Sequence, residues 1–268
     1  MIIDQNFKFS YSSISLYIKC QRAFYYRYIE KVEAKKGNVY QYVSSIIHFV
    51  LEDMLKRKLN NEEIGDEYNL IYEIMKSNPP GNIEYYKYDD KKVFDEIVNI
   101  TKKLKSNIND ISYMYNNVKD KYIESDLLLE NEKYKFIAKP DYIFINDKGI
   151  YLYDFKIVSS FKSMKNYTTM VNDKSSPENI RQHDIYSYCF EKKFNKKIDN
   201  MYYLFVFKNP NLDKLFLPFK IKINEFNFSI VENLINEIKS KNNKLDFKIN
   251  IGHCNNCYFN HVCNKEFS

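Results

Sequence analysis

Glycine is scarce in this sequence, with only five residues among 268. The two closest, Gly65 and Gly81, lie 16 positions apart. Both common phosphate-binding loops, G-x-G-x-x-G and G-x-x-x-x-G-K-[ST], need glycines within a few residues of each other. The sequence therefore excludes a self-contained P-loop ATPase and a Rossmann enzyme.

Long apolar runs and dense cysteines are missing as well. The longest apolar stretches, around 46–51 and 202–207, are far too short to span a bilayer, and residues 1–10 lack the pattern of a signal peptide. Five cysteines are too few for a disulfide scaffold, and in a reducing compartment clustered cysteines more often hold metal. We therefore expect a cytoplasmic protein without a membrane partner.

The chain carries a modest excess of positive charge, with 41 Lys and Arg against 35 Asp and Glu. The formal net charge of +6 suits an anionic partner without requiring one. A chain of 268 residues can bury a sizeable core, either as one large domain or as two small ones.

Periodic segments predict an α/β fold built on a mixed sheet. The expected helices run from Ser12 or Ser13 to about Glu30, from about Val39 to Lys58, over 177–194 after the cap Ser176 and Pro177, and over 225–240. The expected strands are 123–130, 133–138, 141–146, 150–157, 201–208 and 214–221. Residues 60–120 are expected to be a helical insertion within a single domain that spans 1–268.

Three charged residues of the central hairpin are expected to lie close together. Asp154 and Lys156 point to the same face because side chains alternate along a strand. If residues 146–149 form the loop, the register places Asp141 opposite Asp154. Directly paired side chains lie about 5 Å apart. Two carboxylates at that distance need a shared proton or a divalent cation, and Lys156 could polarise a water or offset charge on a phosphate.

The plainer alternative is a surface hairpin in which Lys156 makes an ordinary salt bridge with one aspartate. D-x-K triplets are frequent, so the triplet alone favours that alternative. The surroundings of Asp154 argue against it, because this residue lies within the apolar run 150–158, where an unpaired charge is costly. The pattern is therefore typical of a functional site.

Pro140-Asp141, Asp154 and Lys156 resemble the motif of the PD-(D/E)XK nuclease superfamily in residue type and order. The resemblance implies an α/β fold with a restriction-endonuclease-like core, in which helices flank a central mixed sheet. It also implies hydrolysis of DNA phosphodiester bonds with Mg²⁺ or Mn²⁺.

Further segments resemble the RecB-like branch of that superfamily, which includes CRISPR-associated iron-sulfur exonucleases and the nuclease domains of recombination helicases. His48 is similar to the histidine of the branch's G-x-x-x-H motif, although Ser44 replaces the glycine. Gln182 and Tyr186 are similar to its Q-x-x-x-Y motif. Taken singly, His48 is more typical of a core histidine, and the other two could be a packing pair on one helix face.

Four cysteines form a pattern of their own. Three of them make C-x2-C-x5-C near residue 260, and the fourth lies on the first expected helix: Cys20, Cys254, Cys257 and Cys263. The arrangement resembles the 4Fe-4S site of the RecB-like exonucleases, which ties the two chain ends together. Zinc is the alternative, with His253 or His261 in place of Cys20. Cys189 fits neither site and is expected to be a small buried hydrophobe.

The resemblance implies a role for each of these residues. The implied metal ligands are His48, Asp141, Asp154 and the carbonyl of Phe155. Lys156 is expected to orient the attacking water, and Gln182 and Tyr186 are expected to face the active site and the nucleic acid.

The resemblance further implies an exonuclease that acts on single-stranded DNA ends, with a CRISPR integrase or a recombination helicase as partner. Several side chains could follow the strand by charge and stacking, or form a solvated loop: Lys162, Lys165, Tyr167 and Lys174. Two other functions stay open, a non-catalytic DNA-binding or adaptor module with the nuclease fold and a zinc-stabilised DNA-binding protein.

Overall fold

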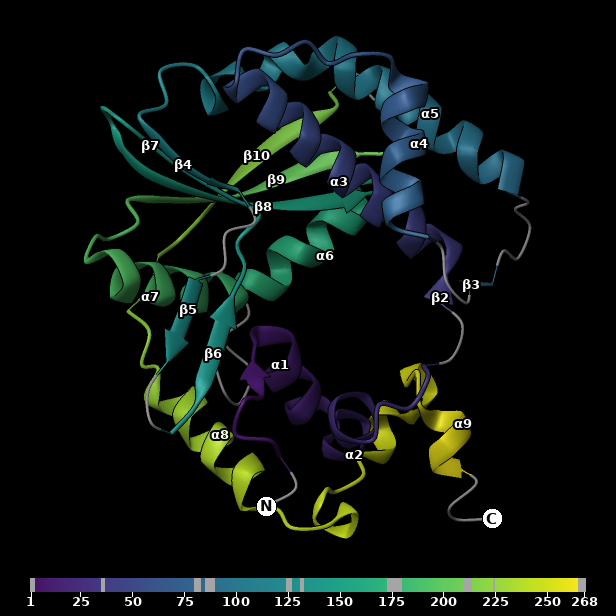
Figure 1. The fold of residues 1–268 in the computed structure, drawn as a ribbon, viewed down its shortest axis with the longest axis vertical. Coiled ribbons are helices and arrows are strands. Elements are labelled where there is room, and N and C mark those ends of the chain that lie inside the picture. Colours follow the sequence, from purple (N-terminus) through teal and green to yellow (C-terminus); the bar gives the residue numbers. More distant parts are fainter. Residues whose placement is uncertain are drawn as a thin grey trace.

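The structure is a computed structural model that describes most of the chain. The described residues are 3–34, 37–79, 83–84, 90–123, 127–130, 133–172, 180–209, 214–223 and 225–264. Their helices and strands form a mixed α/β architecture (Figure 1). Within these ranges, every helix is too short or too polar to cross a bilayer.

A five-stranded sheet lies at the centre of one half of the molecule. Its strands, in spatial order, are β10 (Phe216–Ile221), β9 (Asn200–Phe207), β8 (Gly149–Val158), β7 (Tyr142–Asn146) and β4 (Asp120–Ile123). β8 and β9 run parallel, whereas the other neighbours are antiparallel. The expected mixed sheet is therefore confirmed.

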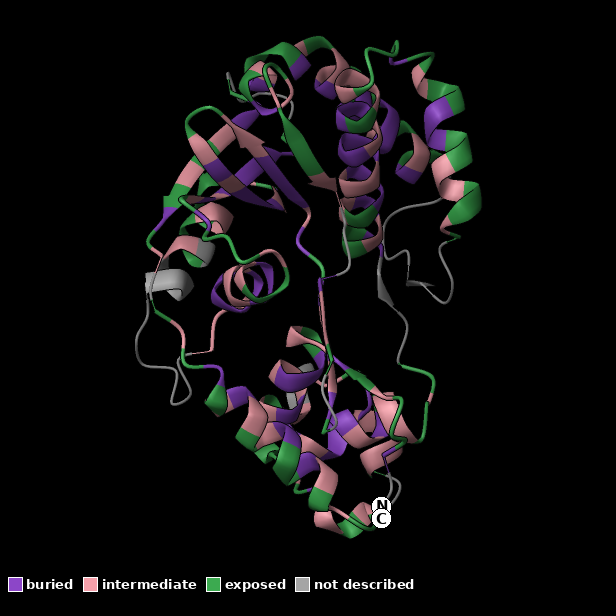
Figure 2. Ribbon diagram, turned by 60° about the vertical axis from the view of Figure 1, so that its left-hand side comes forward, coloured by how far each residue is buried: buried purple, intermediate pink, exposed green. Residues whose placement is uncertain are grey.

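Helices cover both faces of this sheet. On one side lie α3 (Val39–Leu59), α4 (Glu67–Ser77) and α5 (Asp90–Asn107), and on the other lie α6 (Phe161–Asn172) and α7 (Gln182–Phe194) (Figure 1). Because side chains of β8 alternate, Tyr153 and Phe155 join the core under α3 to α5, whereas Leu152 and Val158 join the opposite core. Buried residues accordingly concentrate in the sheet and on the helix sides that face it (Figure 2).

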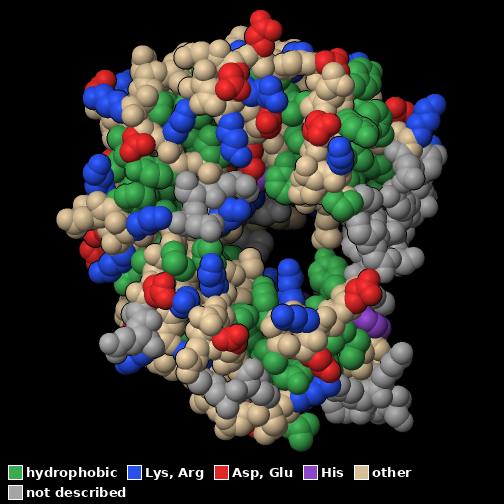
Figure 3. Space-filling model, in the orientation of Figure 1, with side chains coloured by type: hydrophobic (Ala, Val, Ile, Leu, Met, Phe, Trp, Pro, Cys, Tyr) green, Lys and Arg blue, Asp and Glu red, His purple; other side chains and the backbone are tan. Residues whose placement is uncertain are grey.

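A second group of elements lies beyond α6 and α7. It comprises the small sheet of β1 (Lys8–Phe9), β6 (Lys135–Ala138) and β5 (Leu127–Glu130), with α1 (Tyr11–Lys19), α2 (Gln21–Phe24), the π-helical turn η1 (Tyr25–Ile29), α8 (Ser229–Ser240) and α9 (Asn260–Cys263). The space-filling view shows a deep hollow between the two halves, with Lys and Arg side chains along its border (Figure 3).

Short elements complete the described structure. They are the parallel pair β2 (Gly37–Asn38) and β3 (Ile83–Glu84), and the 3-10 turns η2 (Ile108–Met114), η3 (Lys244–Asp246) and η4 (Ile251–Asn256). The helices expected around 39–58 and within 60–120 are present as α3, α4 and α5.

The first helix is shorter than the sequence suggested. We expected one helix from Ser12 or Ser13 to Glu30, but α1 starts after the cap Ser10 and ends where Cys20 becomes extended, with φ −163° and ψ 111°. The break brings distant chain segments together. The backbone N–H of Arg22 donates to the carbonyl of Lys248 at 3.0 Å, so the helical bond to residue 18 is replaced by a tertiary one.

The side chain of Arg22 strengthens the same junction. It is only 4% exposed, and its Nε donates to the carbonyl of Phe247 at 3.1 Å. The ring of Phe247 is fully buried and stacks on Phe24 with centroids 6.2 Å apart. Residues near the two ends of the chain therefore share one packed core.

Four further expectations need correction. The strand expected over 123–130 is two strands, β4 and β5, which belong to different sheets. The helix expected from Pro177 begins only at Gln182, since Ile180 and Arg181 are not helical. Ser176 and Pro177 lie outside the described residues. The segment 161–172, for which a loop was considered, forms α6. The helix expected from 225 begins only at 229.

Gly149 fixes the tight turn between β7 and β8 and yields a stability prediction. Its φ of +133° is a conformation that other residues rarely adopt, and an added Cβ would lie 2.6 Å from the Asp199 carboxylate. That carboxylate accepts the N–H of Ile150 at 2.7 Å. We expect Gly149→Ala to lower the free energy of unfolding by about 1–3 kcal/mol, measured by urea denaturation.

Gly65→Ala provides the matched control, since nothing lies within 4 Å of a Cβ added there. It should leave the urea midpoint almost unchanged. Equal midpoints for the two variants would show that the turn tolerates a side chain at residue 149.

Candidate active site

The hairpin of β7 and β8 brings the two motif aspartates together. Ile145 pairs with Ile150 and Tyr142 with Tyr153, in the register expected from the sequence, although only residues 147 and 148 lie outside the ladder. Asp141 comes directly before β7, and its Oδ2 accepts the backbone N–H of Phe155 at 2.5 Å. This bond holds the Asp141 carboxylate beside residue 154 on the neighbouring strand.

Asp154 is buried, with 3% of its surface exposed, and it contacts Lys156 through an ion pair. Burial raises the pKa of Asp154 to about 7, an effect that the charge of Lys156 opposes and the charge of Asp141 reinforces. Burial opposes the charged form of Lys156, but the charges of Asp154 and Asp141 outweigh it and raise the pKa of this ammonium. Lys156 therefore stays charged, with its Nζ 5.2 Å from the ring centroid of Tyr203.

α3 places His48 against the first aspartate. Its Nε2 lies 3.2 Å from Oδ2 of Asp141, and its Nδ1 lies 2.8 Å from Oε1 of Glu52. Burial alone would lower the pKa of His48, but the hydrogen bonds to Asp141 and Glu52 outweigh it and raise the pKa to about 10. The imidazole is thus protonated between two carboxylates.

Glu52 is a site residue that the motif analysis missed. It is only 2% exposed, and it lies four residues after His48 on the same face of α3. A buried carboxylate needs a partner, and the imidazole supplies one. The spacing H-x-x-x-E on a helix with an apolar face was the available signal.

The donor set suits a divalent cation. Ligand atoms of His48, Glu52 and Asp141 all lie within 4.8 Å of one another. Imidazole and carboxylate groups are accepted ligands of Mn²⁺, and carboxylates suit Mg²⁺. The proton on His48 supplies the positive charge that this cluster needs. A divalent cation bound to the imidazole would have to displace that proton. Asp154 was expected in this set, yet its Oδ2 contacts Lys156.

Gln182 and Tyr186 reach the same region from α7. The amide Nε2 of Gln182 donates to the Tyr186 hydroxyl at 2.5 Å. Burial raises the pKa of Tyr186, and the charges of Asp154 and Asp141 add to the shift. Between them on α7, His183 is 2% exposed, and burial lowers its pKa to about 3, so it is neutral.

α1 contributes a second residue that the motifs did not reveal. Burial raises the pKa of Tyr11, a hydrogen bond to Ser15 and the charge of Lys156 oppose the shift, and the charge of Asp154 adds to it. The charges of Lys156 and Asp154 therefore act on Tyr11. Since α1 belongs to the half of the molecule beyond α7, both halves border the site.

The four motif cysteines line one pocket between α2 and the segment 249–263. Burial raises the pKa of Cys257, and the charges of the other three thiols, Cys20, Cys254 and Cys263, add to this shift. Cys189 is far from this group in sequence and is fully buried on α7.

The spacing of the sulfur atoms bears on which metal they could hold. Four ligands of one zinc ion lie about 4 Å apart, since each Zn–S bond is about 2.3 Å. Within the described part of the chain, no three of these thiols lie within 4.8 Å of one another, whereas His48, Glu52 and Asp141 do. His253 lines the pocket as well, but His261 does not.

The proposed strand-following side chains lie on or after α6. Lys162 and Lys165 belong to this helix, while the side chain of Tyr167 and all of Lys174 lie outside the described residues. Lys162 is exposed, as expected for a side chain available to an anionic strand.

The position of Glu52 generates a prediction about metal binding. Glu52→Gln keeps the shape of the side chain but removes the charge that orients and polarises His48. We expect the affinity for Mn²⁺, measured by calorimetry, to fall about 10- to 100-fold. Asp53→Asn is the matched control, because Asp53 pairs with Arg57 at 2.5 Å on the outer side of α3. An equal loss in both variants would contradict a specific role of Glu52.

The sequence and the structure were compared with known proteins. Among solved structures, a Eubacterium rectale protein designated "putative exonuclease" has 11% identity and a TM-score of 0.49, over 87% of this chain and 78% of its own. The protein SSO0001 has 14% identity and a TM-score of 0.35, over 93% of this chain and 94% of its own. No curated protein matches the sequence. The family model described as the PD-(D/E)XK nuclease superfamily matches residues 8–264, and this chain therefore belongs to that superfamily.

Proposed function

We propose that the protein is a Mg²⁺- or Mn²⁺-dependent deoxyribonuclease. The observation that carries the proposal is that the buried Asp154 lies beside the partly buried Asp141, with the positive charges of His48 and Lys156 next to them. Placing two carboxylates in a buried site is costly, and a purely structural core would not need them. Membership of the nuclease superfamily supports the same activity.

The proposed ligands are His48, Asp141, Asp154 and the carbonyl of Phe155. A bound divalent cation supplies positive charge that lowers the pKa of water and neutralises phosphate oxygens. Glu52 keeps Nε2 of His48 directed at Asp141, which holds the imidazole in one orientation. Lys156, fixed by Asp154, offers an ammonium to the charge that builds up on the phosphate during hydrolysis.

We further propose that the substrate is a single-stranded DNA end, degraded as by the RecB-like exonucleases. The hollow between the two halves and the positive side chains along its border support passage of a flexible strand (Figure 3). The charge of Asp154 acts on Tyr11 and Tyr186 from opposite halves, and Tyr11, which is half-buried, is suited to contact a base or sugar. The formal charge of +6 favours binding of any nucleic acid.

The deciding experiment uses end-labelled single- and double-stranded DNA with and without Mg²⁺ or Mn²⁺. The wild-type protein should shorten the single strand only when metal is present. Asp154→Asn and Lys156→Met should each lower the rate about 10²- to 10³-fold, because each removes charge from the reacting centre.

Asp147→Asn is the control for removal of an aspartate from the same hairpin. Asp147 lies in the exposed turn, where it pairs with Lys119. This variant should cleave at the wild-type rate. A wild-type protein that binds the strand but never cuts it would instead support the adaptor function.

A 4Fe-4S cluster held by Cys20, Cys254, Cys257 and Cys263 is part of the proposal. The four thiols line one pocket, and four thiolates are the ligand set of a 4Fe-4S cluster. The cluster would be structural, since it lies at the junction of the chain ends. Thiolate ligands of this kind also fit a cytoplasmic location, and we propose that 1–268 works as one nuclease domain, most of which the family model matches.

Replacement of one cluster ligand tests this assignment. Cys257→Ala should lower both the iron content and the thermal stability of the protein, measured by metal analysis and thermal unfolding. Cys189→Ala is the control, because it removes a buried thiol on α7 and should leave the iron content unchanged. A colourless wild-type protein with stoichiometric zinc would overturn the iron-sulfur assignment.

A further inference from the structure

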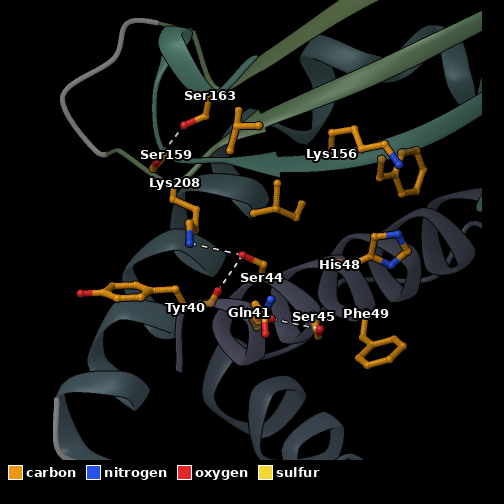
Figure 4. Close-up of a pocket in the computed structure, with 13 residues that line it drawn as sticks. Tyr40, Gln41, Ser44, Ser45, His48, Phe49, Lys156, Ser159, Ser163 and Lys208 are labelled. Atoms are coloured by element: carbon orange, nitrogen blue, oxygen red, sulfur yellow. Dashed lines mark hydrogen bonds between the residues drawn. The ribbon is translucent and has the colours of Figure 1, made fainter. Parts of the chain in front are cut away.

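A pocket extends from His48 along the first half of α3. Its volume is about 690 Å³, and α3, the end of β8, the start of α6 and the residue after β9 enclose it (Figure 4). Its lining side chains include two lysines, Lys156 and Lys208, and several hydroxyl groups. Among the described residues that line it there is no aspartate or glutamate. The pocket is therefore suited to an anion.

Lys208 is held rigidly at one end of this pocket. Its backbone N–H donates to the carbonyl of Val158 at 2.8 Å, which continues the pairing of β8 with β9. Its Nζ donates to the hydroxyl of Ser44 at 3.2 Å, and the ring centroid of Tyr40 lies 6.0 Å away (Figure 4). Ser44 in turn donates to the carbonyl of Tyr40 at 2.8 Å, so its lone pairs are free to accept the ammonium hydrogen.

The charge of Lys208 has no nearby carboxylate among the described residues. Within the described ranges Lys208 forms no ion pair with a carboxylate, and the charge of Glu96 only partly offsets the effect of burial on its pKa. Burial accordingly lowers the pKa of Lys208. An ammonium has three donors, and the serine hydroxyl uses one. A phosphate oxygen would satisfy the donors that face the pocket.

The spacing of Ser44 and His48 along α3 is comparable with the spacing of a nucleic acid backbone. Ser44 and His48 share one face of α3 at i and i+4, about 6 Å apart along the axis. This is comparable with the separation of successive phosphates in an extended strand. If one phosphate lies at His48, its neighbour reaches Ser44 and Lys208.

We propose that Lys208 and Ser44 form a subsite for the phosphate next to the scissile one, with the ring of Tyr40 as a stacking surface for the attached base. Tyr40 is 44% exposed, so its ring is accessible. The inference rests on the proposed nuclease function. It also gives a role to Ser44, at which this chain departs from the glycine of the motif that it resembles.

A binding cycle tests this subsite. The Kd of a fluorescein-labelled oligothymidylate is measured by fluorescence anisotropy with Ca²⁺ in place of Mg²⁺. The titration is then repeated with strands that each carry one uncharged methylphosphonate linkage, placed at successive positions from each end. Lys208→Gln should raise the Kd of the fully charged strand about tenfold and reduce the salt slope by about 0.7. One methylphosphonate should weaken binding to the wild type by a similar factor and leave Lys208→Gln unaffected.

Lys220→Gln is the matched control, since Lys220 is an exposed lysine on β10 that bonds Asn200 at 2.8 Å and lies near Tyr202. It should respond to the methylphosphonate like the wild type. If every neutral linkage weakens the wild type and Lys208→Gln equally, the subsite is wrong although the nuclease function stands. A wild-type protein that neither binds nor cuts DNA overturns both.

Discussion

The confinement of two carboxylates in one buried place governs the organisation of this protein. Asp141 and Asp154 meet because a two-residue turn fixes the register of β7 and β8, and the backbone N–H of Phe155 holds the first of them. Their mutual repulsion in a site of low polarity must be offset by positive charge. α3 delivers His48 for that purpose, and β8 itself delivers Lys156.

The neutralising groups are themselves held from outside. Glu52 secures His48 from within α3, and Tyr203 lies beside Lys156 from β9. α7 and α1 add Tyr186 and Tyr11 from two other directions. The site is consequently formed by elements that are far apart in the sequence. Each of these neighbouring side chains can change the charge balance of the site even though it is not one of the two aspartates.

The sequence contained enough information to predict the sheet and the hairpin, because alternation along 150–158 and the polar turn fix both. Contacts of the site with residues from other helices and strands were harder to predict. Glu52 followed a recognisable spacing but was hidden in an apolar helix, and Tyr11 is brought close only by the tertiary fold. The helix break at Cys20 was invisible in the pattern, because its cause is a bond from Arg22 to a segment more than two hundred residues away.

That last contact has a kinetic consequence. Arg22 and Phe247 are separated by 225 positions, so the small core around Phe24 closes a loop that includes almost all of the chain. Closing such a loop costs more entropy than forming the local hairpin, and contacts of this separation slow folding. We therefore expect the hairpin of β7 and β8, whose contacts are local, to form before the half that carries α1 is complete.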